Sequence, residues 1–342
     1  MEVIRGLDSV KLKLPGSVLT VGNFDGVHRG HQQLLAQGGL LAADTGHPLT
    51  VLTFEPHPLS VVAPRKAPAC LTSLEDKLAQ LAARGADVTV VAQSTPELLS
   101  LEAEAFARDI IVGLFRPTHV VEGPSFGFGR GRRGTVDLLR RLGAEHGFEV
   151  CAVGPVQLQV EPGQTVLVSS SLIRDLIARG KIHRAALCLG RPYQLVGQVV
   201  PGHDRGKSLG YPTANIRVGD VLIPPDGVYS GRAQVGDLVA PAAISIGTAP
   251  TFGQGPRQIE AHLLGFSGDL YGRTARLDFL RWLRRQEVFP STGALVEQMK
   301  RDIATVRAHA HDAEVTGNGD EGTQGRGNRG KRGTVSASDR DA

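Results

Sequence analysis

SVLTVGNFDGVHRGH, residues 17–31, is the stretch that decides the fold. The run Val18–Val21 is apolar and predicts a β-strand, and Gly22 and Gly26 predict a tight turn directly after it. A helical pattern follows from about Gly30 to Ala43. A strand that turns directly into a helix is the first half of a crossover unit, so this stretch favours a parallel sheet covered by helices.

The same alternation continues through the first half of the chain. The runs PLTVLTF, ADVTVVAQ, THVVEG and FEVCAVGPV predict strands, whereas SLEDKLAQLAARG, EAEAFARDIIVGLF and TVDLLRRLGAEHG predict helices. Strands that alternate with helices of about ten to fifteen residues indicate an α/β domain with a parallel sheet.

The pattern changes in the second half. SSLIRDLIARGKIHRAALCLG predicts two short helices broken at Gly180. The β-type runs YQLVGQVV, GVYSGRAQV, LVAPAAISIG, QIEAHLLGF and RTARLDFLRWL follow without intervening helices, which predicts an antiparallel barrel or sandwich. One helix at about Thr292–His309 closes this part. We expect domains over 1–185 and 186–310, and a disordered tail over 311–342 that almost lacks large apolar residues.

Composition limits the class of protein. The chain has 342 residues, 41% of them hydrophobic and 21% charged, with a formal net charge of +4. This length suggests two domains, and the mild charge without a basic, aromatic-rich stripe argues against a nucleic-acid partner. Cys70, Cys151 and Cys188 form no CxxC pair, which fits a reducing cytoplasm. No signal segment or membrane-length apolar run is visible, so we expect a cytoplasmic protein without a membrane partner. The residues indicate no oligomeric state.

Two histidines follow the first strand and suggest three interpretations. His28 and His31 could share a zinc ion with His57, lie in a solvated loop, or stabilise a phosphate. Ligands of open parallel sheets bind at the carboxyl ends of the strands, and the start of a helix attracts anions. The glycines and the strand-to-helix turn therefore favour the phosphate, whose developing charge imidazole N–H groups can stabilise.

A second anion-binding element comes much later in the chain. VSSSLIR places the hydroxyls of Ser170 and Ser171 at an expected helix start, with Arg174 three residues further on. Hydroxyls, helix N–H groups and a guanidinium together make an anion site. With the histidines, they suggest a triphosphate that is held from both sides.

GNFDGVHRGH, TFEPHP and SSSLIR together resemble the nucleotidyltransferase half of the bacterial bifunctional riboflavin kinase/FMN adenylyltransferases. The resemblance implies a Rossmann-like domain that transfers an adenylyl group from ATP to FMN, giving FAD and pyrophosphate. It implies catalytic roles for His28 and His31. The ATP-binding residues that it implies are Gly22, Asn23, Phe24, Asp25, Gly26, His28, His31, Ser170, Ser171 and Arg174, with Asp25 either placing a metal or fixing the loop.

The segment VEGPSFGFGRGRRG departs from the family pattern at one position. It keeps Gly123, Phe126, Phe128 and Gly129, but has Ser125 where the family has aspartate or asparagine. The resemblance associates Ser125, Phe126 and Phe128 with the flavin.

The second half resembles the riboflavin kinase half of the same family. PGHDRGKSLGYPTANI lies among strands and is one residue short of P-loop spacing, so the P-loop mechanism does not apply. It matches the riboflavin kinase signature instead, which implies a small antiparallel β-barrel. The resemblance implies ATP contacts by Gly206, Lys207, Gly210, Pro212, Thr213 and Asn215, with Thr213 and Asn215 binding Mg²⁺.

Two further residues complete the expected kinase site. Glu260 in IEAHLL is a carboxylate among apolar neighbours, and on the inner face of a barrel it would be costly unless functional. The resemblance makes Glu260 the base that accepts the proton of the ribityl hydroxyl, and makes Arg284 a flavin contact.

We therefore expect a bifunctional enzyme that uses riboflavin, FMN and ATP as substrates and Mg²⁺ as cofactor. The first alternative is a relative with kinase activity alone or with altered flavin specificity, which Ser125 motivates. The second is a flavin-binding regulator without turnover, against which the retained His28, His31, Asn215 and Glu260 argue.

Overall fold

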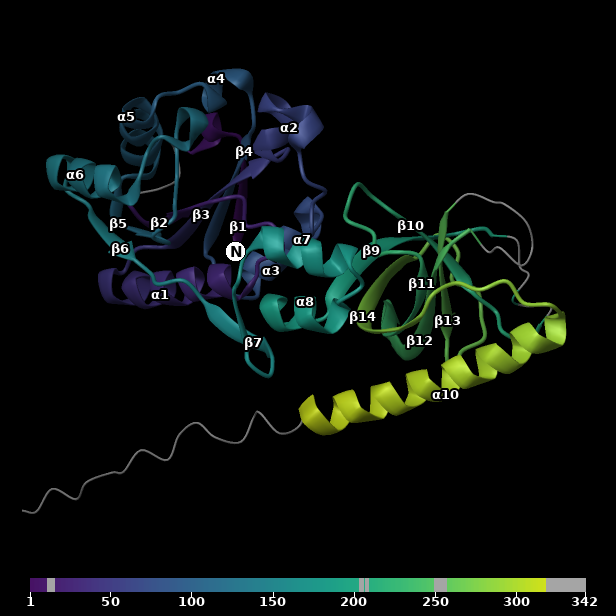
Figure 1. Ribbon diagram of the computed structural model, residues 1–342. Helices are drawn as coiled ribbons and strands as arrows, with labels where there is room; N and C mark the ends of the chain where they lie inside the picture. The colour runs from purple at the N-terminus through teal and green to yellow at the C-terminus, as the bar shows by residue number, and fades with distance from the viewer. Residues whose placement is uncertain (11–15, 203–205, 207–208, 249–256, 318–342) are drawn as a thin grey trace, which may run out of the picture.

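A computed structural model describes residues 1–10, 16–202, 206, 209–248 and 257–317. Figure 1 shows an α/β part and a β-barrel, with two helices between them and a long helix running along the barrel. The expected α/β domain followed by an antiparallel barrel with a C-terminal helix is confirmed.

A six-stranded sheet forms the centre of the α/β part. Its strands are β1 (Glu2–Arg5), β2 (Ser17–Val21), β3 (Leu49–Glu55), β4 (Val88–Gln93), β5 (Pro117–Glu122) and β6 (Glu149–Ala152). They pair in the order β1-β4-β3-β2-β5-β6, and every pairing is parallel. β3, β4 and β1 lie on one side of β2, and β5 and β6 lie on the other. The topological switch point therefore lies between β2 and β5.

Helices connect the strands. They are α1 (Arg29–Thr45), α2 (Pro58–Val62), α3 (Leu74–Ala82), α4 (Pro96–Leu99), α5 (Ala103–Ala105), which runs into a π-helix (Phe106–Phe115), and α6 (Val136–His146). The helices α3, α4 and α6 begin with a serine or threonine N-cap. Short 3₁₀ turns lie at Leu7–Ser9, Pro64–Lys66 and Arg130–Arg132. The Ser73 hydroxyl accepts from the Asp76 N–H at 3.1 Å and starts α3.

Four strands were missed by the sequence patterns, three of them before the barrel. β1 is a short edge strand with three of its four residues exposed, so it has no apolar run. The hairpin β7 (Gln157–Glu161) and β8 (Gln164–Leu167) is mostly polar and forms a two-stranded sheet of its own. Neither case offers the hydrophobic periodicity on which strand prediction depends.

The two helices between the lobes are α7 (Ser170–Ala178) and α8 (Ile182–Leu189). They break at Gly180 as predicted, because that glycine adopts φ +69° and lies against the Trp282 ring. Buried side chains of both helices join the apolar core of the barrel in one cluster, which also includes Leu71 of the α/β part. The two lobes therefore share a continuous core through this connector.

The second lobe is a closed antiparallel barrel. Its strands are β9 (Tyr193–Val200), β10 (Ala214–Val218), β11 (Gly227–Val235), β12 (Leu238–Gly247), β13 (Gln258–Leu263) and β14 (Thr274–Arg284), in the order β10-β13-β12-β11-β14-β9. The strand β10, which begins within PTANI and extends to Val218, was not predicted as a strand.

The last described element is α10 (Thr292–Gly317), which packs on β11 and β12. It extends beyond the predicted end at His309 and into the segment expected as a tail, of which 318–342 lie outside the described residues. No helix among the described residues is long and apolar enough to span a membrane.

Candidate active sites

The loop that leaves β2 lies at the topological switch point of the sheet. Gly26 adopts φ +81°, and a Cβ there would lie 2.8 Å from Cδ1 of Leu71, so both conformation and space require glycine. Phe24 and Val27 also adopt left-handed conformations, with φ of 48° and 39°. Two non-glycine residues in this region make the loop a strained segment that its surroundings must hold.

The two histidines form a stacked pair at the start of α1. His28 caps the helix, because its Nδ1 accepts from the His31 N–H at 3.4 Å. The ring centroids lie 3.6 Å apart with an angle of 18° between the planes. Burial lowers the pKa of His28 to about 4, and burial, aided by the His28 charge, lowers the pKa of His31 well below 6.5. Both imidazoles are therefore neutral near pH 7.

Asp25 fixes the loop from the other side. Its carboxylate accepts from the Leu71 N–H at 2.8 Å and the Thr72 N–H at 3.2 Å, and it forms a buried ion pair with Arg174. Of the two predicted roles for Asp25, metal placement and loop fixing, the geometry supports loop fixing. Among the described residues, no three His, Cys, Asp or Glu side chains gather as metal ligands.

The serines at the start of α7 have separate roles. Ser169 is the N-cap, since its hydroxyl accepts from the Leu172 N–H at 3.2 Å. Ser170 donates its hydroxyl to the Asp25 carbonyl at 2.9 Å, and Ser171 is exposed. Ser170 and Arg174 therefore bring α7 against the β2 loop, although about 150 residues separate them in the sequence.

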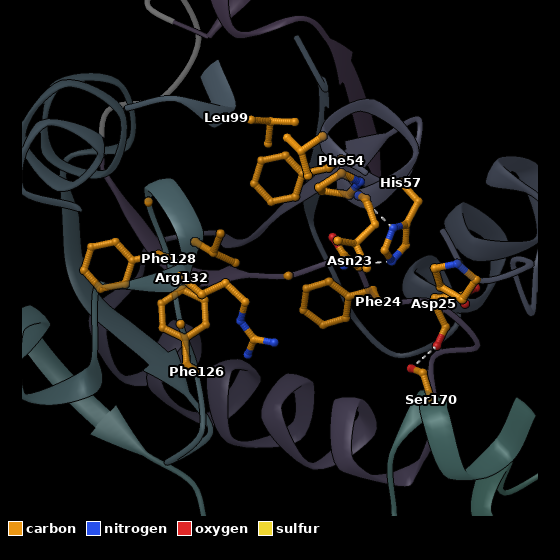
Figure 2. Close-up of a pocket in the computed structure, with 18 of the residues that line it drawn as sticks. Asn23, Phe24, Asp25, Phe54, His57, Leu99, Phe126, Phe128, Arg132 and Ser170 are labelled. Carbon is orange, nitrogen blue, oxygen red and sulfur yellow. Dashed lines mark hydrogen bonds between the residues drawn. The ribbon is translucent and has the colours of Figure 1, made fainter. Parts of the chain in front are cut away.

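These elements surround a cavity of about 750 Å³ (Figure 2). Its polar half is lined by Asn23, Asp25, His31, His57, Ser170, Ser171 and Arg174. Its apolar half is lined by aromatic and aliphatic side chains, including Phe54, Leu99, Phe106, Phe126 and Phe128. A cavity of this size and two-sided character suits a ligand with one charged and one aromatic end.

The aromatic half is built largely by the segment after β5. Phe126 and Phe128 stack with ring centroids 5.5 Å apart, and Phe128 also contacts Phe106 at 6.1 Å. Ser125 is exposed, and its carbonyl accepts from Nη2 of Arg132 at 3.3 Å. The expected flavin contacts Phe126 and Phe128 therefore line the cavity, with Arg132 beside them in Figure 2.

Several site residues were not found from the sequence. His57, considered only as a zinc ligand, caps α2 and lies with Nε2 3.2 Å from Nδ2 of Asn23. Glu122 is fully buried, accepts from the Val21 N–H at 2.6 Å, and has a pKa raised well above its usual value by burial. Lys77 lies beneath the β2 loop. Glu122 and Lys77 act through contacts distant in sequence, so no local pattern marks them, whereas His57 lies in the TFEPHP stretch.

A second polar cluster lies on the barrel. Asn215 of β10 pairs directly with Glu260 of β13, and Glu260 pairs with Ser245 of β12. The register continues through Val228 to Arg284 of β14. The predicted residues Asn215, Glu260 and Arg284 thus lie in one row across the barrel.

Glu260 does not lie on the inner face of the barrel, where its carboxylate would have been costly. Its neighbours Ile259 and Ala261 are in the barrel core, so strand alternation turns Glu260 to the opposite, partly exposed face. The carboxylate therefore needs no functional explanation for its burial.

The nucleotide-signature residues that are described lie around Asn215. A Cβ on Gly202 would come within 1.8 Å of Nδ2 of Asn215, so a larger residue at 202 would force that amide to move. Gly206 accepts from the Tyr211 N–H at 2.8 Å, and Gly210 adopts φ +83°. Pro212 accepts from the His262 ring at 2.8 Å, and Thr213 follows it directly. Lys207 lies outside the described residues.

Arg284 is engaged by the C-terminal helix. Its Nη2 lies 2.8 Å from the Asp302 carboxylate of α10, which is itself buried, and its guanidinium lies over the Phe289 ring. This ion pair anchors α10 to the end of β14. The predicted contact of Arg284 with flavin stays a prediction.

Comparisons with known proteins match both lobes. The FAD synthetase family model matches residues 11–170, and the riboflavin kinase model matches residues 189–310. The bifunctional riboflavin kinase/FMN adenylyltransferase of Escherichia coli is 36% identical over 90% of this chain and 97% of its own length. That of Pseudomonas fluorescens is 36% identical over 91% and 98%.

A solved structure described as a macrolide-efflux protein from Streptococcus pneumoniae has the same two-lobed fold. It covers 90% of this chain and 99% of its own, with a TM-score of 0.79 and 26% identity. Full-length similarity to the enzymes, both family models and the two polar clusters lead to one conclusion. The chain belongs to the bifunctional riboflavin kinase/FMN adenylyltransferase family.

Proposed function

We propose that the cavity of the α/β lobe binds ATP in its polar half and FMN in its aromatic half. The chain carries riboflavin kinase and FMN adenylyltransferase activities, as its family membership indicates. In the second reaction an oxygen of the FMN phosphate attacks the α-phosphorus of ATP, the bond to the β-phosphate bridging oxygen breaks, and pyrophosphate leaves. FAD is the product.

The observation that carries this assignment is the stacked pair His28 and His31 at the start of α1. Neutral imidazoles donate N–H groups without a fixed charge, and the helix start adds its dipole. His31 lines the cavity and His28 stacks on it, so His31 and the helix start can stabilise the negative charge that builds on the phosphates as the bond to pyrophosphate breaks, with His28 holding the His31 ring. Ser170, Ser171 and Arg174 support the opposite wall, where Ser170 and Arg174 hold the β2 loop in place.

For the kinase reaction, the row on the barrel supplies a base and oxygen ligands. We assign Glu260 as the group that accepts the proton of the ribityl hydroxyl while that oxygen attacks the γ-phosphorus of ATP, the bond to the β–γ bridging oxygen breaks and ADP leaves. Asn215 lies directly opposite Glu260, close enough for one substrate to touch both residues.

Thr213 and Asn215 fit the Mg²⁺ that the family is expected to use. Oδ1 of Asn215 is buried and has no hydrogen-bond partner among the described residues. An amide oxygen left without a donor is a suitable ligand for a hard cation. When bound, Mg²⁺ would neutralise charge on the ATP phosphates.

We place the boundary between the adenylyltransferase and kinase domains at residues 185 and 186, within α8. The test of the whole assignment is a product analysis. The purified chain is incubated with riboflavin, ATP and Mg²⁺, and the flavins are separated by chromatography. FMN followed by FAD is expected, whereas FMN that never becomes FAD would refute the adenylyltransferase assignment.

A further inference from the structure

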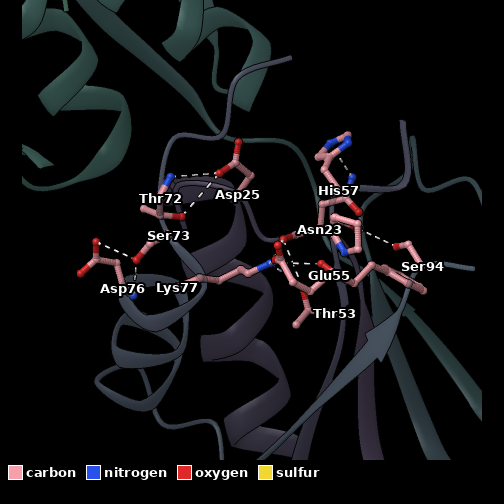
Figure 3. Close-up of polar contacts among 12 residues, drawn as sticks. Asn23, Asp25, Thr53, Glu55, His57, Thr72, Ser73, Asp76, Lys77 and Ser94 are labelled. Atoms are coloured by element: carbon pink, nitrogen blue, oxygen red, sulfur yellow. Dashed lines mark hydrogen bonds and ion pairs between the residues drawn. The ribbon is translucent and has the colours of Figure 1, made fainter. Parts of the chain in front are cut away.

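Lys77 of α3 has a buried ammonium group at the end of β3 (Figure 3). Its Nζ lies 3.4 Å from the Asn23 carbonyl, 3.4 Å from the Thr53 hydroxyl and 3.3 Å from the Phe54 carbonyl. Three acceptors match the three hydrogens of an ammonium group. The Glu55 carboxylate, 3.6 Å away, supplies the opposite charge. These partners compensate for burying the charge of Lys77 and fix the position of its ammonium group.

The contact with Asn23 matters most, because several interactions meet at that carbonyl. The Thr53 hydroxyl also donates to it, at 3.2 Å. The next residue, Phe24, has φ 48°, a left-handed conformation that is unfavourable for a non-glycine residue. Such conformations persist where neighbouring groups hold them. The Phe24 ring in turn contacts the His31 ring, with centroids 4.9 Å apart.

We propose that Lys77 is a positioning residue of the adenylyltransferase site. Its ammonium holds the Asn23 carbonyl, and this fixes the left-handed turn at Phe24 and the place of His31 against the cavity. Lys77 does not line the large cavity among the residues described there, so it acts through the loop rather than on substrate. The inference rests on the proposed adenylyl transfer at this site.

Besides burial, the charge of Lys77 lowers the pKa values of His57 and His31, and this effect helps to test the proposed role of Lys77. Burial lowers the pKa of His57, and the positive charges of Arg174 and Lys77 lower it further, against the effect of Asp25. Burial and the charge of His28 lower the pKa of His31, and Lys77 adds to this. Removing the ammonium therefore raises both pKa values, whereas a change of packing alone leaves its charge in place.

The test compares Lys77→Met with Lys66→Met, which alters an exposed lysine of the same domain. FAD formation from supplied FMN and FMN formation from riboflavin are measured separately. We expect Lys77→Met to lower kcat/KM for FAD formation about 10- to 100-fold, as small misplacements of a site do, with FMN formation within twofold of normal. The acid limb of its pH profile should move to higher pH. Lys66→Met should change none of these.

Equal FAD formation by Lys77→Met and the unaltered chain would overturn the inference while leaving the proposed function intact. If the unaltered chain makes no FAD, the proposed function itself fails. Should Lys77→Met lose both activities through unfolding, Thr53→Val decides, because it keeps the side-chain shape and removes one donor to the Asn23 carbonyl. A several-fold loss of FAD formation supports the inference, and no loss refutes it.

Discussion

Replacing Asp25 with asparagine should separate the β2 loop from α7. The ion pair between Asp25 and Arg174 is buried, with 7% and 16% of the two side chains exposed. Asparagine keeps one oxygen for the N–H groups of Leu71 and Thr72, but it puts an NH₂ group where Arg174 needs an acceptor. Arg174 retains its contact of 2.8 Å between Nε and the Ala69 carbonyl, so its charge stays in the interior.

Removing one partner of a buried ion pair costs about 3–5 kcal/mol, because the other charge stays buried without compensation. In a domain of this size, 1 kcal/mol shifts Tm by about 2–4 °C. Asp25→Asn should therefore lower the Tm of the α/β lobe by about 6–20 °C. The matched control is Asp175→Asn in α7, the helix that carries Arg174. The ion pair of Asp175 with Arg179 is exposed and contributes about 0.3–0.5 kcal/mol. The expected Tm shift of this control is about 1–2 °C.

Calorimetry of the full chain measures both variants, with FAD formation as a second readout. A third variant, Asp25→Asn with Arg174→Met, should be less destabilised than Asp25→Asn alone, because no buried guanidinium then lacks its counter-ion. The reasoning fails if Asp25→Asn has the same Tm as Asp175→Asn, or if the double variant has the lowest Tm of the three.

Three further predictions concern other parts of the two sites. Glu260→Gln should lower FMN formation by about 100-fold or more, as expected for loss of a general base, and leave FAD formation from supplied FMN unchanged; equal loss of both would contradict the assignment. The pKa of His28 falls from 6.5 to about 4 on folding, so as pH falls the imidazole is protonated first in the unfolded chain. His28 should therefore lower the free energy of unfolding by up to about 3 kcal/mol as pH falls from 6.5 to 4. Denaturant titrations of His28→Gln should show a smaller decrease. Gly202→Ala should displace the Asn215 amide and reduce kinase activity, whereas Gly219→Ala, where a Cβ meets nothing within 4 Å, should not; kinase assays of both check this.

The sequence predicts those features that depend on local periodicity. The alternation after Val18–Val21 indicates the parallel sheet, and five of the barrel strands follow from short β-type runs. β10 has the sequence ANIRV, in which Asn215 and Arg217 interrupt a short apolar run, and it becomes a strand because β9 and β13 pair with it. Tertiary pairing, not propensity, determines that element.

The active sites divide in the same way. His28 and His31 can be found because their spacing and the glycines around them lie within one turn of chain. Lys77 reads as an ordinary polar position of an amphipathic helix, and its role exists only where α3 meets the end of β3. Side chains that act on backbone carbonyls leave no motif, because the acceptor can belong to any residue type.

The connection between the two lobes also depends on backbone groups that leave no sequence motif. Three consecutive peptide groups, at residues 69–71, bond to three different elements. The Ala69 carbonyl accepts from Arg174 at 2.8 Å and the Cys70 carbonyl accepts from the Leu222 N–H at 2.7 Å. The Leu71 N–H donates to Asp25 at 2.8 Å. One short segment thus joins α7, the barrel lobe and the β2 loop. Since only peptide groups take part, its side chains can change without breaking these bonds, whereas a proline at residue 71 would remove the donor to Asp25. The geometry of the first site therefore depends on the second lobe through contacts that residue identity does not record.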